Sequence, residues 1–348
     1  MAKLKDVLIY GFIICCICIL AIGGYYYLKK GSNSTDELKT ANSTPNSKTD
    51  HSEEEYVWIG TMIGHPMYIN NDQEALKQFG KDNGVKVTIA GPREYDIPGQ
   101  TVAIEEAIAR NPAGIMILGM ERGLIPAVNK AVEAGIPTIM VDADLIESKR
   151  IAFVGSNWYN IGVKQAEAMV KLIGGKGKVA ATGIGQADNM EQGYEGFKSV
   201  IKNYPDIVYL GEFDDMCNEE EAQRITEELL NTYPDIAGIA GFDVSSGPGI
   251  GQAIKQADMI GKVKVTCVDI EPAHLKLCKE GVIQKLVGQK RKLFTYYGAR
   301  LLYDYNHATI SFYKDMKKSQ ITPIPYIIDT GLIEIDQTNV ESFLQEAQ

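Results

Sequence analysis

From Tyr56 onward, short apolar runs alternate with longer stretches in which apolar residues recur at helical spacing. Many of the short runs place β-branched or other apolar residues on successive positions, as in strands that are buried on both faces. Several helical stretches end in Gly or Asn just past the periodic part, a usual stop signal. Strands are predicted at residues 56–63, 85–90, 114–118, 137–142, 151–155, 178–184, 207–213, 236–242, 263–269 and 283–288. Helices are predicted at residues 74–84, 101–111, 124–135, 162–175, 195–204, 220–233 and 249–258.

The repeated strand–helix–strand order predicts an α/β fold, with parallel sheets that carry helices on both faces. About ten strands are more than one doubly wound sheet usually holds, and the series divides near Asn157. We therefore expect two similar doubly wound lobes with a ligand cleft and a hinge between them. The first lobe is predicted to contain residues 56–157 with part of 290–325, and the second residues 158–289 with part of 326–348.

The N-terminal segment is the most apolar part of the chain. Residues 7–28 carry no charge and are long enough as a helix to span a membrane. Lysines flank the run on both sides, and no small-residue cleavage site follows it, so we favour an uncleaved anchor at residues 1–30 over a cleaved signal peptide. Residues 31–55 are rich in Ser, Thr, Asn and charge, which predicts a disordered stalk.

Composition and motifs exclude several classes of function. The net charge of −10 disfavours nucleic acid as a partner. The six cysteines lack metal-ligand spacing, and the glycine-rich stretch at residues 174–178 lacks the Ser or Thr of a P-loop. The sequence contains neither HExxH nor GxSxG, so we expect no metal, no cofactor and no catalytic residues.

Polar and aromatic residues gather where the predicted strands end. In an open α/β sheet the carboxyl ends of the strands form the ligand site. Carboxylates and amides there can bind hydroxyl groups, and flat rings can cover the apolar faces of a sugar. The candidate ligand residues are His65, Met67, Tyr68, Asp142, Ala143, Asn157, Asn189, Glu191, Phe242, Asp243, Asp269 and Gln289.

Four segments lie in a fixed order along the chain. His65-Pro66-Met67-Tyr68 follows the first predicted strand, the runs IPTIMVDAD and VTCVDI contain strands that end in Asp142 and Asp269, and IQKLVGQ ends in Gln289. In these segments and their order, the chain from Tyr56 to the C-terminus resembles the type I periplasmic binding proteins, in particular the ribose, xylose and galactose branch. By that resemblance, the first segment looks like a ligand loop, and Asp142, Asp269 and Gln289 look like ligand residues at strand ends.

The sequence departs from the family pattern at several site positions. Ala143 stands where the family often has Arg, and Asn189 and Glu191 lie where a second Arg is common. Phe242 stands where Asn is common before Asp243. Other readings of the candidates remain open: an Asp at a strand end can cap a helix, a buried ring can belong to the core, and Gln289 can serve the hinge alone.

The resemblance implies a monosaccharide ligand, with pentoses such as D-xylose or ribose favoured. Together with the anchor, it implies a single-pass protein of the cell membrane whose folded part is extracytoplasmic. We expect a receptor that closes on its sugar and signals to a membrane sensor histidine kinase. The alternative is the substrate-binding subunit of an ABC importer, which would dock on a permease. A second alternative is a sugar-converting enzyme on a related α/β fold.

Overall fold

The computed structural model describes residues 50–307 and 321–346. The predicted anchor and residues 31–49 of the predicted stalk lie outside the described residues. Residues His51–Gln348 belong to one compact unit, and Glu55 begins its first strand. The composition of residues 51–55 suggested stalk, yet these residues belong to the folded unit. No helix in the described ranges is both long and apolar enough to cross a membrane.

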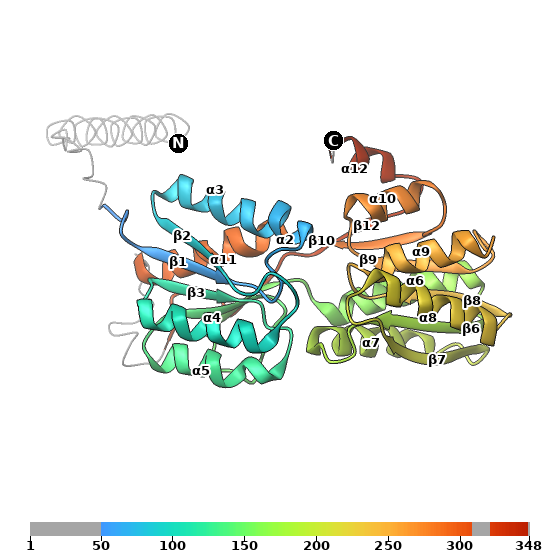
Figure 1. Cartoon of the computed structure of the whole chain (residues 1–348), viewed down its shortest axis with the longest axis horizontal. Coiled ribbons are helices and arrows are strands. Elements are labelled where there is room, and N and C mark those ends of the chain that lie inside the picture. The colour runs from blue at the N-terminus through green and yellow to red at the C-terminus, as the bar shows by residue number, and fades with distance from the viewer. Residues whose placement is uncertain (1–49, 308–320, 347–348) are drawn as a thin grey trace, which may run out of the picture. The chain divides into compact units, whose positions relative to one another are not determined.

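Two six-stranded sheets organise the described part of the chain (Figure 1). The first has the order β11-β5-β4-β3-β1-β2 and the second β12-β10-β9-β8-β6-β7. Neighbouring strands are parallel except β12, which runs antiparallel to β10. The predicted fold class of two parallel-sheet α/β lobes is confirmed. The strands are β1 (Glu55–Ile59), β2 (Lys86–Ala90), β3 (Gly114–Ile117), β4 (Thr138–Asp142), β5 (Ala152–Gly155), β6 (Gly177–Gly183), β7 (Ile207–Asp214), β8 (Ile236–Gly241), β9 (Lys264–Val268), β10 (Lys285–Gln289), β11 (Ile327–Asp329) and β12 (Leu332–Ile335).

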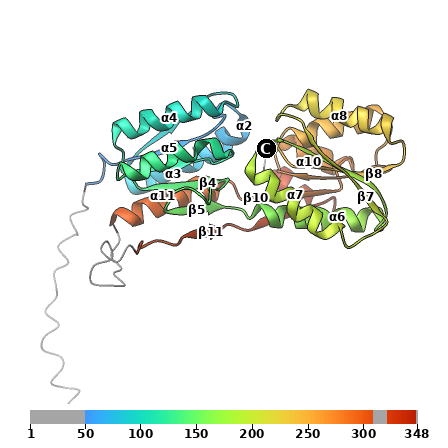
Figure 2. The ribbon, with the colours of Figure 1, turned by 90° about the horizontal axis from the view of Figure 1, so that it is seen from below.

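Helices cover both faces of each sheet, as Figures 1 and 2 show from two directions. On the first sheet, α3 and α11 cover one face and α4 and α5 the other. On the second sheet, α6 and α7 lie opposite α8, α9 and α10. The described helices are α2 (Pro66–Tyr68), the π-helical turn η1 (Ile69–Gln73), α3 (Glu74–Asn83), α4 (Ile97–Arg110), the 3₁₀ turn η2 (Arg122–Leu124), α5 (Ile125–Glu133), α6 (Trp158–Ile173), α7 (Asp188–Ile201), α8 (Glu219–Thr232), α9 (Ser246–Gln256), α10 (Pro272–Lys279), α11 (Lys292–His307) and α12 (Val340–Glu346).

The apolar strands fill a core on each face of their sheet. In β1, Tyr56 and Trp58 pack towards α3 and α11, whereas Val57 and Ile59 pack towards α4 and α5. This two-residue alternation explains why the strand is apolar at successive positions. On the second sheet, α6 and α7 approach so closely that a Cβ on Gly162 would lie 1.8 Å from the carbonyl oxygen of Gly193.

The described chain passes between the two sheets three times. The first passage follows β5 of the first sheet and leads to α6, which packs on the second sheet. The next follows β10 of the second sheet and leads to α11 on the first. The last connects β11 of the first sheet to β12 of the second. These passages bring Asn157, Gln289, Arg291 and Thr330 to the region between the sheets. Three parallel passages are the kind of connection about which a hinge motion can occur.

Candidate functional site

A buried pocket lies where the carboxyl ends of strands from both sheets meet. Residues that directly end or follow β1, β3, β4, β6, β7, β8, β9 and β10 line it, so the predicted location at the strand ends agrees with the structure. The cavity has a volume of about 30 Å³, which is room for about two water molecules. A monosaccharide needs more space, so binding requires the walls to move. The lining residues are Met62, Met67, Tyr68, Met120, Asp142, Trp158, Ile184, Asn189, Met190, Cys217, Asp243, Val244, Asp269, Gln289 and Arg291.

Asp142 and Asp269 occupy equivalent places in the two halves. Asp142 ends β4 and Asp269 follows β9, and each of these strands is third in the order of its sheet. Both residues have a left-handed backbone, with φ of 67° and 73°. This conformation is uncommon outside glycine and is tolerated best by Asn and Asp. Such strain at two matching strand ends is typical of positions that are held for function.

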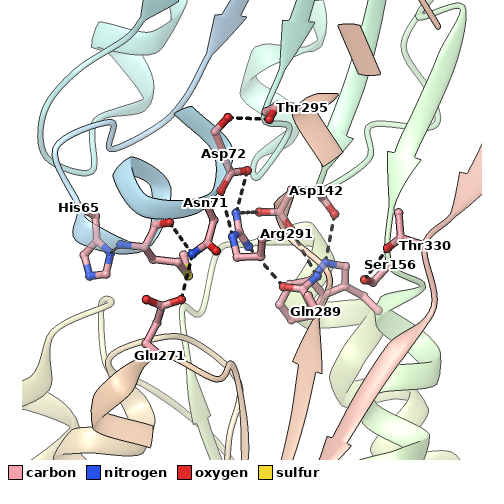
Figure 3. A network of polar contacts seen from close by, with 12 residues as sticks. His65, Asn71, Asp72, Asp142, Ser156, Glu271, Gln289, Arg291, Thr295 and Thr330 are labelled. Atoms are coloured by element: carbon pink, nitrogen blue, oxygen red, sulfur yellow. Dashed lines mark hydrogen bonds and ion pairs between the residues drawn. The ribbon is translucent and has the colours of Figure 1, made fainter. Parts of the chain in front are cut away.

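Arg291 forms the centre of the polar network in Figure 3. Its Nη2 donates to Oδ2 of Asp142 at 2.7 Å, and its Nε donates to Oδ2 of Asp72 at 3.1 Å. Its Nη1 donates to Oε1 of Gln289 at 3.4 Å, and Gln289 Nε2 donates to Oδ1 of Asp142 at 3.4 Å. The guanidinium also lies over the Tyr68 ring, 4.8 Å from its centroid. One buried cation therefore orients two carboxylates, an amide and a ring at the pocket.

The carboxylates outnumber this single cation. Burial raises the pKa of Asp269 to about 7, although the charge of Arg291 acts in the opposite direction. Burial likewise raises the pKa of Asp72 to about 7 in spite of its ion pair with Arg291. Burial and the charge of Asp215 raise the pKa of Asp243 well above its ordinary value. The pocket is therefore rich in acceptor oxygens and disfavours further negative charge.

Several acceptor atoms at the pocket have no partner among the described residues. Oδ1 of Asn189 and Oδ2 of Asp243 are buried and receive no hydrogen bond from a donor group, although the carboxyl of Asp215 lies beside that of Asp243. The carboxylate of Asp269 also accepts no hydrogen bond from the described chain, although its oxygens are not fully buried. Buried polar atoms are nearly always satisfied, so the atoms of Asn189 and Asp243 point to a bound group that donates hydrogen bonds, and Asp269 offers further acceptors beside them. Hydroxyl groups supply such donors without adding charge.

Aromatic and thioether side chains form the apolar part of the wall. Tyr68 and Trp158 are 2% and 6% exposed, and Met62, Met67 and Met190 are buried beside them. Trp158 also donates from Nε1 to the backbone carbonyl of Asp142 at 3.3 Å, which fixes its ring. Rigid rings next to unbranched methionines can cover the C–H faces of a small polar ligand.

The structure brings together seven of the twelve sequence-predicted residues and places the other five outside the pocket lining. The seven are Met67, Tyr68, Asp142, Asn189, Asp243, Asp269 and Gln289.

The five outside residues have local roles. His65 caps α2 by accepting a hydrogen bond from the Met67 amide, and Asn157 caps α6 by accepting one from the Asn160 amide. Ala143 is buried behind Asp142. Glu191 is exposed and lies 3.8 Å from Arg122. Phe242 is fully buried against Tyr194, with ring centroids 4.7 Å apart, so it belongs to the core.

Arg291 and Asp72 are the main residues of the polar network that are absent from the twelve candidates. Arg291 stands two residues after Gln289, at the same strand end, so its position in the sequence could have marked it as a candidate. The expected family arginine after Asp142 is absent, but the structure brings a guanidinium to Asp142 from a different segment. Asp72 lies in the turn η1, which carries no strand-end signal.

Direct contacts link the two sides of the pocket at its rim. Asn71 Nδ2 donates to Oε1 of Glu271 at 3.2 Å (Figure 3), and Arg122 pairs with Asp188 at 2.8 Å. Beside Arg122 lies a wider groove of about 600 Å³, which contains Glu191 and is lined mainly by charged side chains. The rim contacts can form or break as the two sides move, so they are suited to a binding-coupled closure.

The geometry defines a two-lobed α/β protein with a buried pocket where the strand ends of the two lobes meet. Residues 56–308 match the family described as Periplasmic binding protein domain, and the chain belongs to this family. The resemblance to the sugar-binding type I branch is thus confirmed. The matching relatives are binding proteins and not enzymes, which confirms that the chain is not an enzyme.

Individual relatives are distant. The D-apiose import binding protein of Paraburkholderia graminis is 27% identical over 175 residues, which cover 49% of this chain and 55% of that protein. The chain therefore matches about half the length of that relative. The solved arabinose-binding protein AraP of Geobacillus stearothermophilus is 29% identical with a TM-score of 0.70, covering 84% of this chain and 99% of that one. XylFII in a solved XylFII–LytSN complex is 23% identical with a TM-score of 0.72, covering 82% and 99%, and shows the fold alone.

Proposed function

We propose that this protein is a membrane-anchored extracytoplasmic receptor for a neutral monosaccharide, with pentoses such as D-xylose or ribose as the favoured ligands. The observation that carries the proposal is the set of unpartnered acceptors on Asn189, Asp243 and Asp269, which face a pocket that also holds Tyr68 and Trp158. Sugar hydroxyls would satisfy these acceptors, and the rings would cover the apolar face of the sugar. Relatives named for apiose and arabinose favour a pentose, while a relative named for D-allose makes hexoses the second class of sugar to test.

The mechanism we propose is closure about the three passages between the sheets. In the closed form, Asp142 contacts the sugar from one side and Asp269 from the other. The sugar therefore binds the closed form more tightly than the open form, and this difference in affinity stabilises closure. The present cavity is too small for a sugar. An opening step must therefore precede binding, and the Asn71–Glu271 contact would have to break in that step.

The anchor and the signalling role are proposed from the N-terminal sequence and from the fold. The uncharged apolar run at residues 7–28 supports a single membrane span, which suits a receptor that stays beside a membrane partner. A chain of this fold occurs in the XylFII–LytSN complex, so the fold itself is compatible with docking to a second protein. We propose a sensor histidine kinase as that partner.

The second candidate function is sugar import through an ABC permease. The name of the D-apiose import binding protein favours it. A strain that lacks this gene separates the two functions. Loss of sugar-dependent transcription with intact sugar uptake supports the receptor, and loss of uptake supports the importer.

Calorimetric titration of the chain with pentoses and hexoses tests the sugar proposal. We expect one pentose to bind with a stoichiometry of one. The Asp269→Asn variant should lose most of the affinity, while Asp235→Asn should keep it because Asp235 is exposed and pairs with Lys178 before β8 begins. Failure of every sugar to bind, or equal affinity of both variants, contradicts the proposal.

A further inference from the structure

A second cluster of ligand-type side chains lies at the opposite end of the first sheet from the pocket. His51 and Glu54 precede β1, and His307 ends α11. His51 Nδ1 lies 2.6 Å from Oε1 of Glu54, and His307 Nε2 lies 2.9 Å from Oε2 of the same carboxylate. The two imidazole rings are 4.1 Å apart between centroids. Two of the four histidines of the chain thus share one carboxylate.

This set has the composition of a zinc site. One ligand atom from each of the three residues lies within 4.8 Å of the others. Two imidazoles and one carboxylate form a known ligand set for Zn²⁺ that leaves a fourth position for water. The three side chains are between 20% and 26% exposed, so an ion can reach them from solvent while the surrounding residues still hold them.

Neighbouring residues orient the three ligands. The Tyr56 hydroxyl donates to Oε2 of Glu54 at 2.8 Å, and Asn306 Nδ2 donates to the Tyr56 hydroxyl at 3.2 Å. The Tyr303 ring packs against His307 and His51, with centroid distances of 4.4 and 5.6 Å. A supporting shell of this kind raises metal affinity because it fixes ligands in place before the ion arrives.

We propose that His51, Glu54 and His307 bind one Zn²⁺ ion. Zinc bonds of about 2.0–2.1 Å hold neighbouring ligand atoms about 3.3 Å apart. The two His–Glu spacings of 2.6 and 2.9 Å must therefore open by roughly 0.5 Å, and ligand atoms that now lie up to 4.8 Å apart must close by up to roughly 1.5 Å. Rotations of the partly exposed side chains would supply both changes. The ion takes the place of the protons that now lie between each imidazole and the carboxylate.

The site would join the segment that enters the fold to the last helix of the first sheet. His51 is the first residue of the compact unit and lies near the end of the stalk that the sequence predicts at residues 31–55. A bond from His51 to α11 ties the stalk to the body of the receptor. This role is independent of sugar binding, because the cluster and the pocket lie at opposite ends of the strands.

The test is zinc titration of the full chain, purified in detergent without a histidine tag. Cys15, Cys16 and Cys18 are replaced by serine in every protein compared, because thiolates bind zinc by themselves. We expect one Zn²⁺ per chain and a rise in unfolding temperature. His51→Ala and His307→Ala should each lower zinc affinity about tenfold or more. His65→Ala is the matched control and should keep the affinity.

X-ray absorption of the zinc-loaded chain gives a readout that does not depend on a variant folding. Two imidazole ligands with only oxygen or nitrogen neighbours support the site. The absence of stoichiometric zinc binding, or wild-type affinity in both His51→Ala and His307→Ala, overturns the proposal and leaves the cluster as hydrogen-bonded side chains only.

Discussion

Replacement of Asp269 by Asn separates the binding role of this residue from its effect on stability. Asp269 is 5% exposed and follows β9 with a left-handed backbone that Asn also tolerates. The substitution keeps the shape of the side chain and removes its charge. If the carboxylate is held for a ligand, the variant should lose affinity and gain stability.

The expected gain follows from the pKa of the carboxyl group. Burial raises this pKa from 3.8 to about 7, so the folded protein binds the proton more tightly than the unfolded chain does. The charge of Asp269 therefore costs no stability below about pH 4, costs progressively more up to about pH 7, and costs a constant amount above that. At about 1.4 kcal/mol per pKa unit, the cost reaches at most about 4 kcal/mol.

Urea unfolding of wild type and Asp269→Asn at pH 4 and pH 8 measures this difference. The two proteins should have similar free energies of unfolding at pH 4, and the variant should be the more stable one at pH 8. The sugar affinity of the Asp269→Asn variant should fall roughly 10- to 150-fold. This fall corresponds to the loss of one hydrogen bond to a charged group, which contributes about 1.5–3 kcal/mol. Equal stability of the two proteins at pH 8 would refute the reasoning.

Three further perturbations test other parts of the structure. Arg291→Met leaves Asp142 and Asp72 buried without a cation and should lower the free energy of unfolding by about 3–5 kcal/mol in urea titrations. The control Lys290→Met changes the exposed neighbouring residue and should have little effect. Gly162→Ala forces a Cβ against the Gly193 carbonyl and should lower the free energy of unfolding by roughly 1–3 kcal/mol or more. The control Gly123→Ala should have little effect, because its Cβ would meet no atom within 4 Å. Equal unfolding midpoints of the two variants would contradict the close packing of α6 and α7. Deletion of residues 2–49 should move the protein from the membrane to the soluble fraction. The sugar affinity measured by calorimetry should stay unchanged, because the first residue that lines the pocket is Met62. Loss of binding would mean that the deleted segment contributes to the site.

The parallel strands were predictable because they are buried on both faces. Each of the ten predicted apolar runs corresponds to a strand of the structure, from β1 to β10. The missed strands β11 and β12 contain three and four residues and are largely half-exposed or exposed, so they carry no apolar run. The helix α11 was also missed, because its tyrosines and charged residues obscure the apolar face that packs on the first sheet.

The pocket was predictable only where its lining residues coincide with strand ends. Asp142, Asp269 and Gln289 were found in this way, and the structure places all three at the pocket. Asn157 and Phe242 follow strands as well, but one side chain turns to cap α6 and the other turns into the core. Asp72 reaches Arg291 behind the pocket because η1 packs against α11, a tertiary contact that no local pattern reveals.

A crystal structure of the chain grown with the sugar that binds in the titration tests the central claim most directly. We expect one monosaccharide in the pocket, with its hydroxyls bonded to Asp269, Asp243 and Asn189 on one side and to Asp142 or Arg291 on the other. A sugar bound in the charged groove beside Arg122 and Glu191, with the pocket still closed by the Arg291 network, would contradict it.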